Sequence, residues 1–166
     1  MKNPLPTHNL SVYVANQPGA LARIAQTFSR RGFNIESLVV SPGKTEDFSR
    51  MTITVKGAED SLAQVIQQCS KLVDVIACRE HTDEEVVSRE LALVKLAVMA
   101  EQRAEVLQIA DHFHAKTVDL AEGAMVLEAT GSSPKLDAMV GLLRKFTIVE
   151  LVRTGKVIVA RGERET

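Results

Sequence analysis

The sequence has 166 residues, enough for one medium domain or two small ones, and is 45% hydrophobic and 25% charged, as in ordinary globular proteins. Its net charge of −1 provides no basic surface of the kind that nucleic acids or anionic membranes attract, and no apolar run approaches the ~20 residues of a membrane span. We therefore expect a cytoplasmic protein with no nucleic acid and no membrane among its partners.

The first half of the sequence predicts the order strand–helix–strand–strand–helix–strand. Apolar alternation indicates strands at 10–15, 34–41, 51–55 and 73–80. A helix opens at Pro18 and Gly19 and ends at Gly32, and a second helix covers 62–72. The buried stripe of the first helix is expected to be Leu21, Ile24, Ala25 and Phe28. This order is the ferredoxin-like βαββαβ arrangement, with both helices on one face of a four-stranded sheet.

The pattern repeats after an acidic stretch, HTDEEVV at 81–87, which we interpret as a linker. Strands are expected at 91–99, 116–121, 124–130 and 148–154, with 157–160 extending the last one past Gly155. Helical stripes run over 106–113 and 136–143, and Ser133 and Pro134 are expected as the N-cap and first helical residue of the second. The predicted class is therefore α+β, with two ferredoxin-like domains at 8–82 and 86–162.

Each predicted sheet has one face without helices, and such an apolar face needs a cover. The sequence leaves two possibilities for what covers this face. The two units could cover each other, or a second copy of the chain could do so.

No group of residues has the spacing of a catalytic or metal site. His112 and His114 are two residues apart and so do not face each other on a helix, and Cys69 and Cys78 lack the CxxC pattern. We expect both thiols to be reduced and partly buried, and the acids at 83–85 to be a solvated spacer. We therefore expect no catalytic residue and no metal ligand in this chain, which disfavours a small ferredoxin-like enzyme.

The sequence lacks the elements that RNA binding or control of transcription would require. RNA-binding domains with this strand order stack bases on aromatic residues of the open sheet, but the third strand reads FSRMTITV. A sensor that controls transcription would need a DNA-reading element such as a helix-turn-helix, and no segment remains to form one.

The stretch NQPGALARIAQTFSRRGFNIESL, at 16–38, is where a ligand could bind. A helix N-terminus offers unpaired N–H groups and a partial positive charge, and Gly19 lets an anion approach the backbone. Asn16 and Asn34 can donate and accept hydrogen bonds, which suits a zwitterion. The alternative is purely structural: Asn16 caps the helix, Gly19 permits close packing and Asn34 starts a strand.

The same stretch resembles the signature of an ACT domain, a small-molecule-sensing module of amino-acid metabolism. The blocks GFNIESLVVSP, SRMTITV, KLVDVI, RELALVKL, SSPKLDAM and IVELVRTGKVIVARG resemble, in this order, the small regulatory subunit of acetolactate synthase (acetohydroxyacid synthase). The resemblance runs from about residue 8 to about residue 162 and identifies 8–82 as an ACT domain for effector binding and dimerisation.

The resemblance implies a regulatory chain that is not an enzyme itself. Such a chain has no cofactor of its own and activates a large catalytic subunit that carries thiamine diphosphate, magnesium and FAD. It also confers feedback inhibition by valine or another branched-chain amino acid. Two ACT domains pair in a homodimer, and the effector lies between the first strand–helix loop of one chain and the second strand of its partner. The matching residues here are Asn16, Gln17, Pro18, Gly19, Ala20, Leu21, Asn34 and Ile35.

Overall fold

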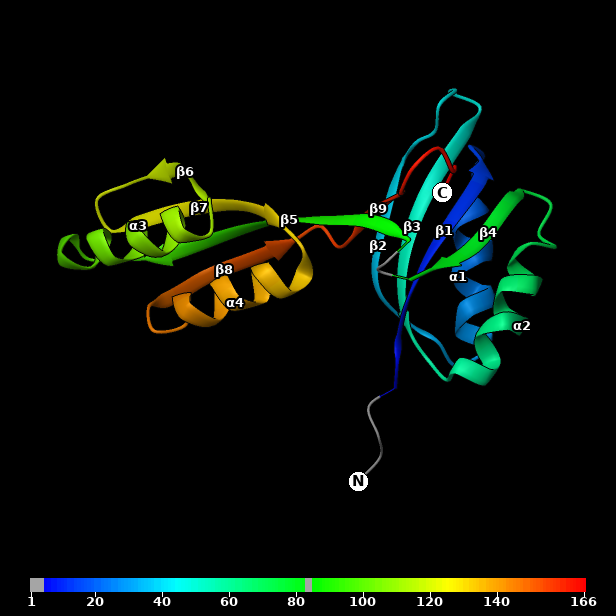
Figure 1. Cartoon of the computed structure of the whole chain (residues 1–166), viewed down its shortest axis with the longest axis horizontal. Coiled ribbons are helices and arrows are strands. Elements are labelled where there is room, and N and C mark those ends of the chain that lie inside the picture. The colour runs from blue at the N-terminus through cyan, green and yellow to red at the C-terminus, as the bar shows by residue number, and fades with distance from the viewer. Residues whose placement is uncertain (1–4, 83–84) are drawn as a thin grey trace. The chain divides into compact units, whose positions relative to one another are not determined.

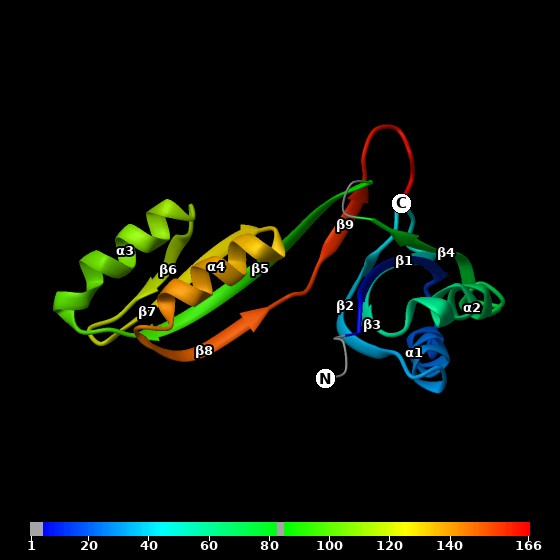
Figure 2. The same cartoon turned by 60° about the horizontal axis from the view of Figure 1, so that its bottom comes forward.

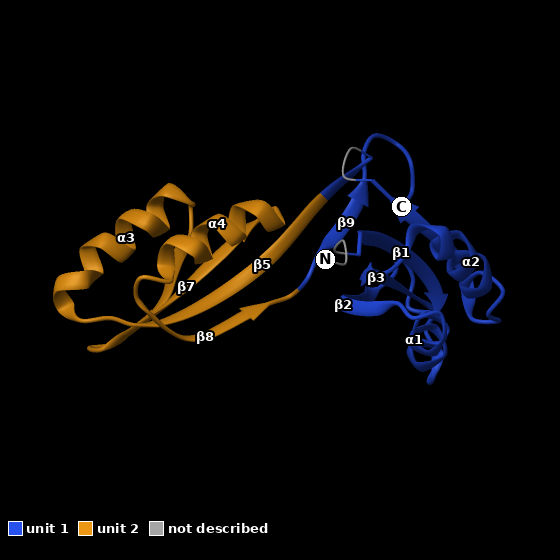
Figure 3. Cartoon of the chain, turned by 90° about the horizontal axis from the view of Figure 1, so that it is seen from below, with its two compact units in different colours: residues 1–87, 155–166 blue, residues 88–154 orange. Residues whose placement is uncertain are grey.

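A computed structural model describes residues 5–82 and 85–166 of the chain. Asp83 and Glu84, in the predicted linker, lie outside the described residues. The chain divides into two compact units, coloured separately in Figure 3: residues up to 87 together with 155–166 form unit 1, and residues 88–154 form unit 2. Each unit has an α+β architecture and is described by itself.

Unit 1 is a four-stranded antiparallel sheet in the order β2-β3-β1-β4, packed against two helices (Figure 1). It confirms the predicted βαββαβ order. Its elements are β1 (Thr7–Ala15), α1 (Ala20–Arg30), β2 (Asn34–Pro42), β3 (Phe48–Lys56), α2 (Glu59–Cys69) and β4 (Val75–His81).

The core of unit 1 lies between the sheet and the two helices. Leu10, Val12 and Val14 point into it from β1 and have no exposed surface, as the alternation predicts. The helix contributes Ile24 and Phe28, whereas the expected stripe residue Leu21 is 42% exposed, so this part of the prediction is wrong.

The stripe of α1 starts one residue earlier than predicted. It consists of Ala20, Ile24 and Phe28, which are spaced by four residues and so lie one above the other on the helix. A residue next to Ala20 in sequence is rotated about 100° away from this stripe, which turns the Leu21 side chain outward.

Unit 2 repeats the arrangement with the sheet order β6-β7-β5-β8. Its apolar stripe at 136–143 is buried as predicted, but Ser132 and not Ser133 is the N-cap, and the Ser133 hydroxyl donates to Glu90. The elements are β5 (Val86–Ala97), a 3₁₀ turn η1 (Ala100–Gln102), α3 (Arg103–His112), β6 (Lys116–Leu120), β7 (Ala124–Gly131), α4 (Ser133–Leu143) and β8 (Thr147–Arg153).

The last strand, β9 (Val157–Ala160), follows β8 after a break at 154–156, and both strands pair with β5. β9 belongs to unit 1, with residues 155–166. Gly155 has φ +83°, a left-handed conformation that glycine adopts without strain, and a Cβ there would lie 2.6 Å from Ser37 Cβ. Gly155 therefore lies close to Ser37 of β2 within unit 1.

This C-terminal segment, residues 155–166, lies over part of the helix-free face of unit 1 (Figure 2). Arg50 of β3 donates from Nη2 to the carbonyl oxygen of Ile158 at 2.8 Å, and the Arg161 N–H donates to Glu85 O at 2.9 Å. A segment of the same chain thus covers part of this face. The sequence analysis had considered only the other unit or a second copy of the chain as the cover.

Phe28 provides a direct test of the unit 1 core. Its side chain is fully buried, so Phe28→Ala is expected to lower the free energy of unfolding of unit 1 by about 3–5 kcal/mol. The measurement is urea unfolding followed by circular dichroism. Val73 is 91% exposed, so Val73→Ala is the matched control and should change nothing measurable. Equal losses in the two variants would contradict this account of the core.

Candidate functional site

The loop between β1 and α1 exposes the N-terminus of α1. Gly19 is the N-cap with φ +86°, and no side chain caps the helix. Pro18, expected as the first helical residue, precedes this cap. The Ala20 N–H donates to Gln17 O at 3.3 Å. Since the first N–H groups of a helix have no acceptor within it, this end carries the partial positive charge that attracts anions.

Arg23 adds a full positive charge at the same place, and the sequence analysis missed it. A Cβ on Gly19 would lie 2.9 Å from Arg23 Nη1, so the guanidinium group covers the glycine. Arg23 Nε donates to Asp74 Oδ2 at 2.6 Å, and Asp74 is buried just before β4. The signal was available, because residues four apart on a helix are neighbours and Arg23 follows Gly19 by four.

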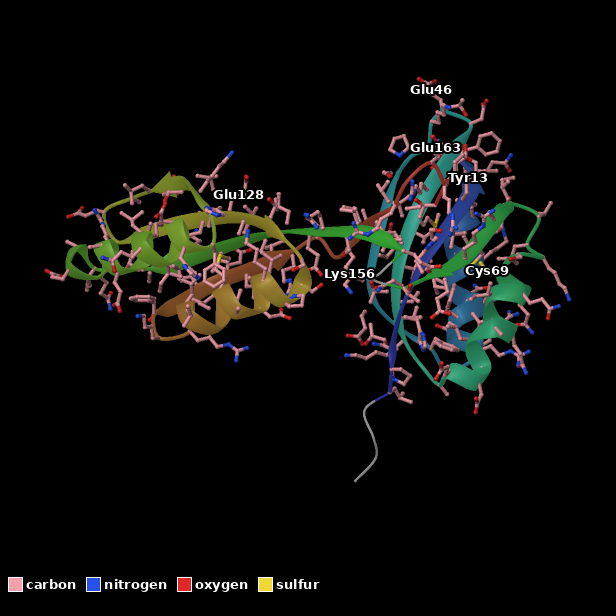
Figure 4. The ribbon with its side chains drawn as sticks, in the orientation of Figure 1. Tyr13, Glu46, Cys69, Glu128, Lys156 and Glu163 are labelled. Carbon is pink, nitrogen blue, oxygen red and sulfur yellow. The ribbon has the colours of Figure 1, made fainter. Side chains whose placement is uncertain are left out.

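Asn16 ties the loop to the turn between β2 and β3. Its Nδ2 donates to Glu46 O at 3.1 Å and its backbone N–H donates to Asp47 O at 2.8 Å. Figure 4 shows Glu46 in this turn, at the end of the sheet. Asn16 therefore does not cap α1, which was the structural alternative for this residue. It holds the loop in place beside the helix terminus.

Asn34 and Ile35 lie at the other end of the sheet. Asn34 pairs with Lys56 of β3, and Lys56 pairs with Thr7, the first residue of β1, whereas the loop follows Ala15, the last. Helix α1, which joins the two places, has 11 residues and is about 16 Å long. Within one chain the predicted loop residues and the predicted strand residues therefore do not meet around one small ligand.

Asn34 takes part in a small polar network at this second place. Its Nδ2 donates to Glu36 Oε1 at 2.6 Å, and Lys56 Nζ lies 3.0 Å from Glu36 Oε2. The hydrogen bonds from Lys56 and Asn34 lower the pKa of Glu36. Ile35 is partly buried against the core. The amide of Asn34 is exposed and keeps its carbonyl oxygen available as an acceptor.

The described residues contain no cluster of three or more His, Cys, Asp or Glu side chains that could hold a metal ion. Cys69 and Cys78 are free and buried in the unit 1 core, where the neighbouring Cys69 thiol and burial raise the pKa of Cys78. His112 packs its ring on Phe113 at the end of α3. Within residues 5–82 and 85–166, no helix is long and apolar enough to cross a membrane.

Two protein families match successive parts of the chain. Residues 10–77 match the family described as "AHAS small subunit-like ACT domain", and residues 89–162 match "Small subunit of acetolactate synthase". The two matches together span nearly all of the chain and follow its two ferredoxin-like arrangements.

Relatives with similar sequences carry the same description. The acetolactate synthase small subunit of Mycolicibacterium smegmatis is 43% identical over 99% of this chain and 96% of its own length. The probable acetolactate synthase small subunit of Archaeoglobus fulgidus is 43% identical over 95% of this chain and 99% of its own length. The crystal structure of the Thermotoga maritima small subunit superposes with a TM-score of 0.86 at 34% identity, covering 96% of this chain and 100% of that one.

The contribution of the Arg23–Asp74 ion pair to stability can be tested by removing the negative charge of Asp74. Asp74→Asn is expected to lower the stability of unit 1 by about 1–2 kcal/mol, because Asp74 is buried while Arg23 stays partly exposed. Urea unfolding measures the change. Glu46→Gln is the control, since Asn16 contacts only the backbone of Glu46. An Asp74→Asn chain as stable as the control would show that the ion pair does not hold this loop.

Proposed function

The chain belongs to the acetolactate synthase small-subunit family and is a regulatory, non-catalytic subunit, and we propose that it activates the catalytic large subunit and imposes feedback inhibition by valine on it. The proposal assigns thiamine diphosphate, magnesium and FAD to the large subunit. It places the complex in the cytoplasm, where buried thiols such as Cys69 and Cys78 stay reduced.

The observation that carries the proposal is the separation of the two predicted half-sites. The loop at 16–21 and the pair Asn34–Ile35 lie at opposite ends of one sheet. An effector that uses both half-sites therefore needs a second copy of the chain. The need for two copies at one site is a reason to expect a homodimer that does not depend on the area of the interface.

The sheet topology supplies a way to make that dimer. β2 is an edge strand of the unit 1 sheet, so its outer side can pair with another strand. If two copies of β2 pair antiparallel, the start of one strand lies beside the end of the other. Pro42, the last residue of β2, pairs with Ser49, and Ala15 pairs with Phe48. The partner's β2 would thus bring its Asn34 to the end of the sheet where the loop at 16–21 begins.

The chemistry of the two half-sites suits a branched-chain amino acid. The ligand carboxylate would bind the N–H groups at the start of α1, close to the guanidinium of Arg23. The ammonium group would donate to the amide oxygen of Asn34 from the other copy. The isopropyl group would contact Leu21, whose 42% exposure is then explained as a ligand-facing apolar surface.

Inhibition by this ligand is a shift between two arrangements of the holoenzyme. Valine inhibits only if it binds the inhibited arrangement more tightly than the active one. A coupling free energy of about 1–3 kcal/mol is typical of such systems. A site shared by two chains provides the coupling, because valine then stabilises one particular packing of the two β2 strands.

Introducing a negative charge at position 19 gives the first test of the function. Asp and Asn have the same shape and both tolerate a positive φ, so Gly19→Asp and Gly19→Asn should strain the chain equally. The aspartate places a fixed carboxylate where the ligand carboxylate would bind. In the holoenzyme reconstituted with its large subunit, the aspartate variant should need at least about tenfold more valine for half-inhibition than the asparagine variant.

Both variants should still activate the large subunit, which shows that they fold. Unchanged valine inhibition in Gly19→Asp would contradict the assignment of the carboxylate to the start of α1.

Mixed dimers test whether two copies share the site. Gly19→Asp damages the loop half-site and Asn34→Ala damages the strand half-site, so homodimers of either variant should lose high-affinity valine binding. A mixed dimer of the two variants has one intact pair of half-sites if each site joins two chains. We expect calorimetric titration to detect valine binding when the two variants are mixed and allowed to exchange.

The same mixture should bind no valine at this affinity if each site is built within one chain, because every chain then carries a damaged site. That result would overturn the shared site and leave activation of the large subunit unaffected.

A further inference from the structure

A basic cavity lies on the helix-free face of unit 1. Its volume is about 790 Å³, and its charged lining residues are Lys44, Arg50, Arg79, Arg164 and Glu165. Tyr13 also lines it, and Figure 4 shows this residue near the end of β1. All of these residues belong to unit 1, so the cavity is complete within one unit.

The register of the sheet explains why these side chains gather on one face. Tyr13 pairs with Arg50 of β3 and with Ala77 of β4, so the three lie side by side across the sheet. Their neighbours Val12, Val14 and Met51 point into the core. Since successive side chains of a strand point to opposite faces, Tyr13 and Arg50 point away from α1 and α2.

Positive charges outnumber negative ones among the side chains that line the cavity. Four cationic side chains line it against the single side-chain carboxylate of Glu165. In the described part of the chain, none of Lys44, Arg50, Arg79 and Arg164 forms an ion pair within 4 Å. Such a concentration of one charge in a partly enclosed space raises the local concentration of counter-ions.

Burial lowers the pKa of two basic groups at or near the cavity. Burial lowers the pKa of Arg50, whose Nη2 already donates to the Ile158 carbonyl oxygen. Burial also lowers the pKa of His81, and Arg50 and Arg79 lower it further while Glu85 opposes them.

The walls of the cavity are held by contacts of their own. The rings of Tyr13 and Phe48 stack with their centroids 5.1 Å apart. A Cβ on Gly43 would lie 3.0 Å from both Tyr13 Cε2 and Phe48 O, so the turn after β2 approaches this wall closely because residue 43 is glycine. On the other side, the Ala160 N–H donates to Thr166 Oγ1 at 2.7 Å and folds the C-terminal segment back.

We propose that the basic cavity binds a small phosphate-bearing anion. Arginine guanidinium groups match the geometry of phosphate oxygens with paired hydrogen bonds, and three arginines converge here. The volume falls in the range of small-molecule sites, which run from about 300 to 1,000 Å³. The cavity lies on the face opposite α1, so this anion and the amino acid proposed above occupy different places.

Titration of the full-length chain with inorganic pyrophosphate tests the proposal. Calorimetry should show saturable binding to the unaltered chain, and inorganic phosphate should compete for it. Arg79→Gln and Arg164→Gln should each weaken binding at least about tenfold, since each removes a charged hydrogen-bond donor. Both side chains are exposed and, within the described part of the chain, form no hydrogen bond or ion pair, so both variants should fold normally.

Arg30→Gln is the matched control, because Arg30 is an exposed arginine at the end of α1, outside the cavity. It should bind pyrophosphate within about twofold of the unaltered chain, as should the Gly19→Asp variant, whose change lies on the other face. Absence of saturable pyrophosphate binding, or an equal loss in Arg30→Gln and Arg79→Gln, would overturn the proposal. Loss of binding in Gly19→Asp would also overturn it by placing the anion at the start of α1.

Discussion

The antiparallel register of β1, β3 and β2 is the constraint on which the rest of unit 1 depends. Because both β1 and β2 pair with β3, they run parallel to each other and α1 must cross the length of the sheet between them. The N-terminus of α1 therefore opens at one end of the sheet and Asn34 lies at the other. This separation makes a shared site a geometric requirement of the proposed function, since neither half-site has a complete set of groups for a zwitterion.

The ligand-binding role proposed for the loop uses neutral and cationic groups and requires no nucleophile and no acid–base pair. Gly19 caps the helix without a side chain, Asn16 anchors the loop to the turn at Glu46, and Arg23 is held by the buried Asp74. These contacts position groups that, in the proposed function, would bind a carboxylate without transforming it. A regulatory chain needs no more than this, provided that the bound ligand favours one packing of two chains over another.

Sequence patterns predicted the order of the strands and helices in both units because the apolar alternation and the helical stripes are strong. They failed where tertiary contacts decide. Leu21 was assigned to the core because its spacing fits, but the buried stripe of the helix starts at Ala20, which turns Leu21 outward. The patterns also did not show that strand 157–160 and β8 both pair with β5, which lies much earlier in the chain. Local periodicity carries no information about such pairing.

The most direct test of the account is a crystal structure of the chain with valine bound. The account predicts one valine at each end of a two-fold seam between paired β2 strands, with its carboxylate at the start of α1 and its ammonium group on Asn34 of the other copy. A valine that contacts a single chain, or a dimer that leaves β2 unpaired, would contradict it.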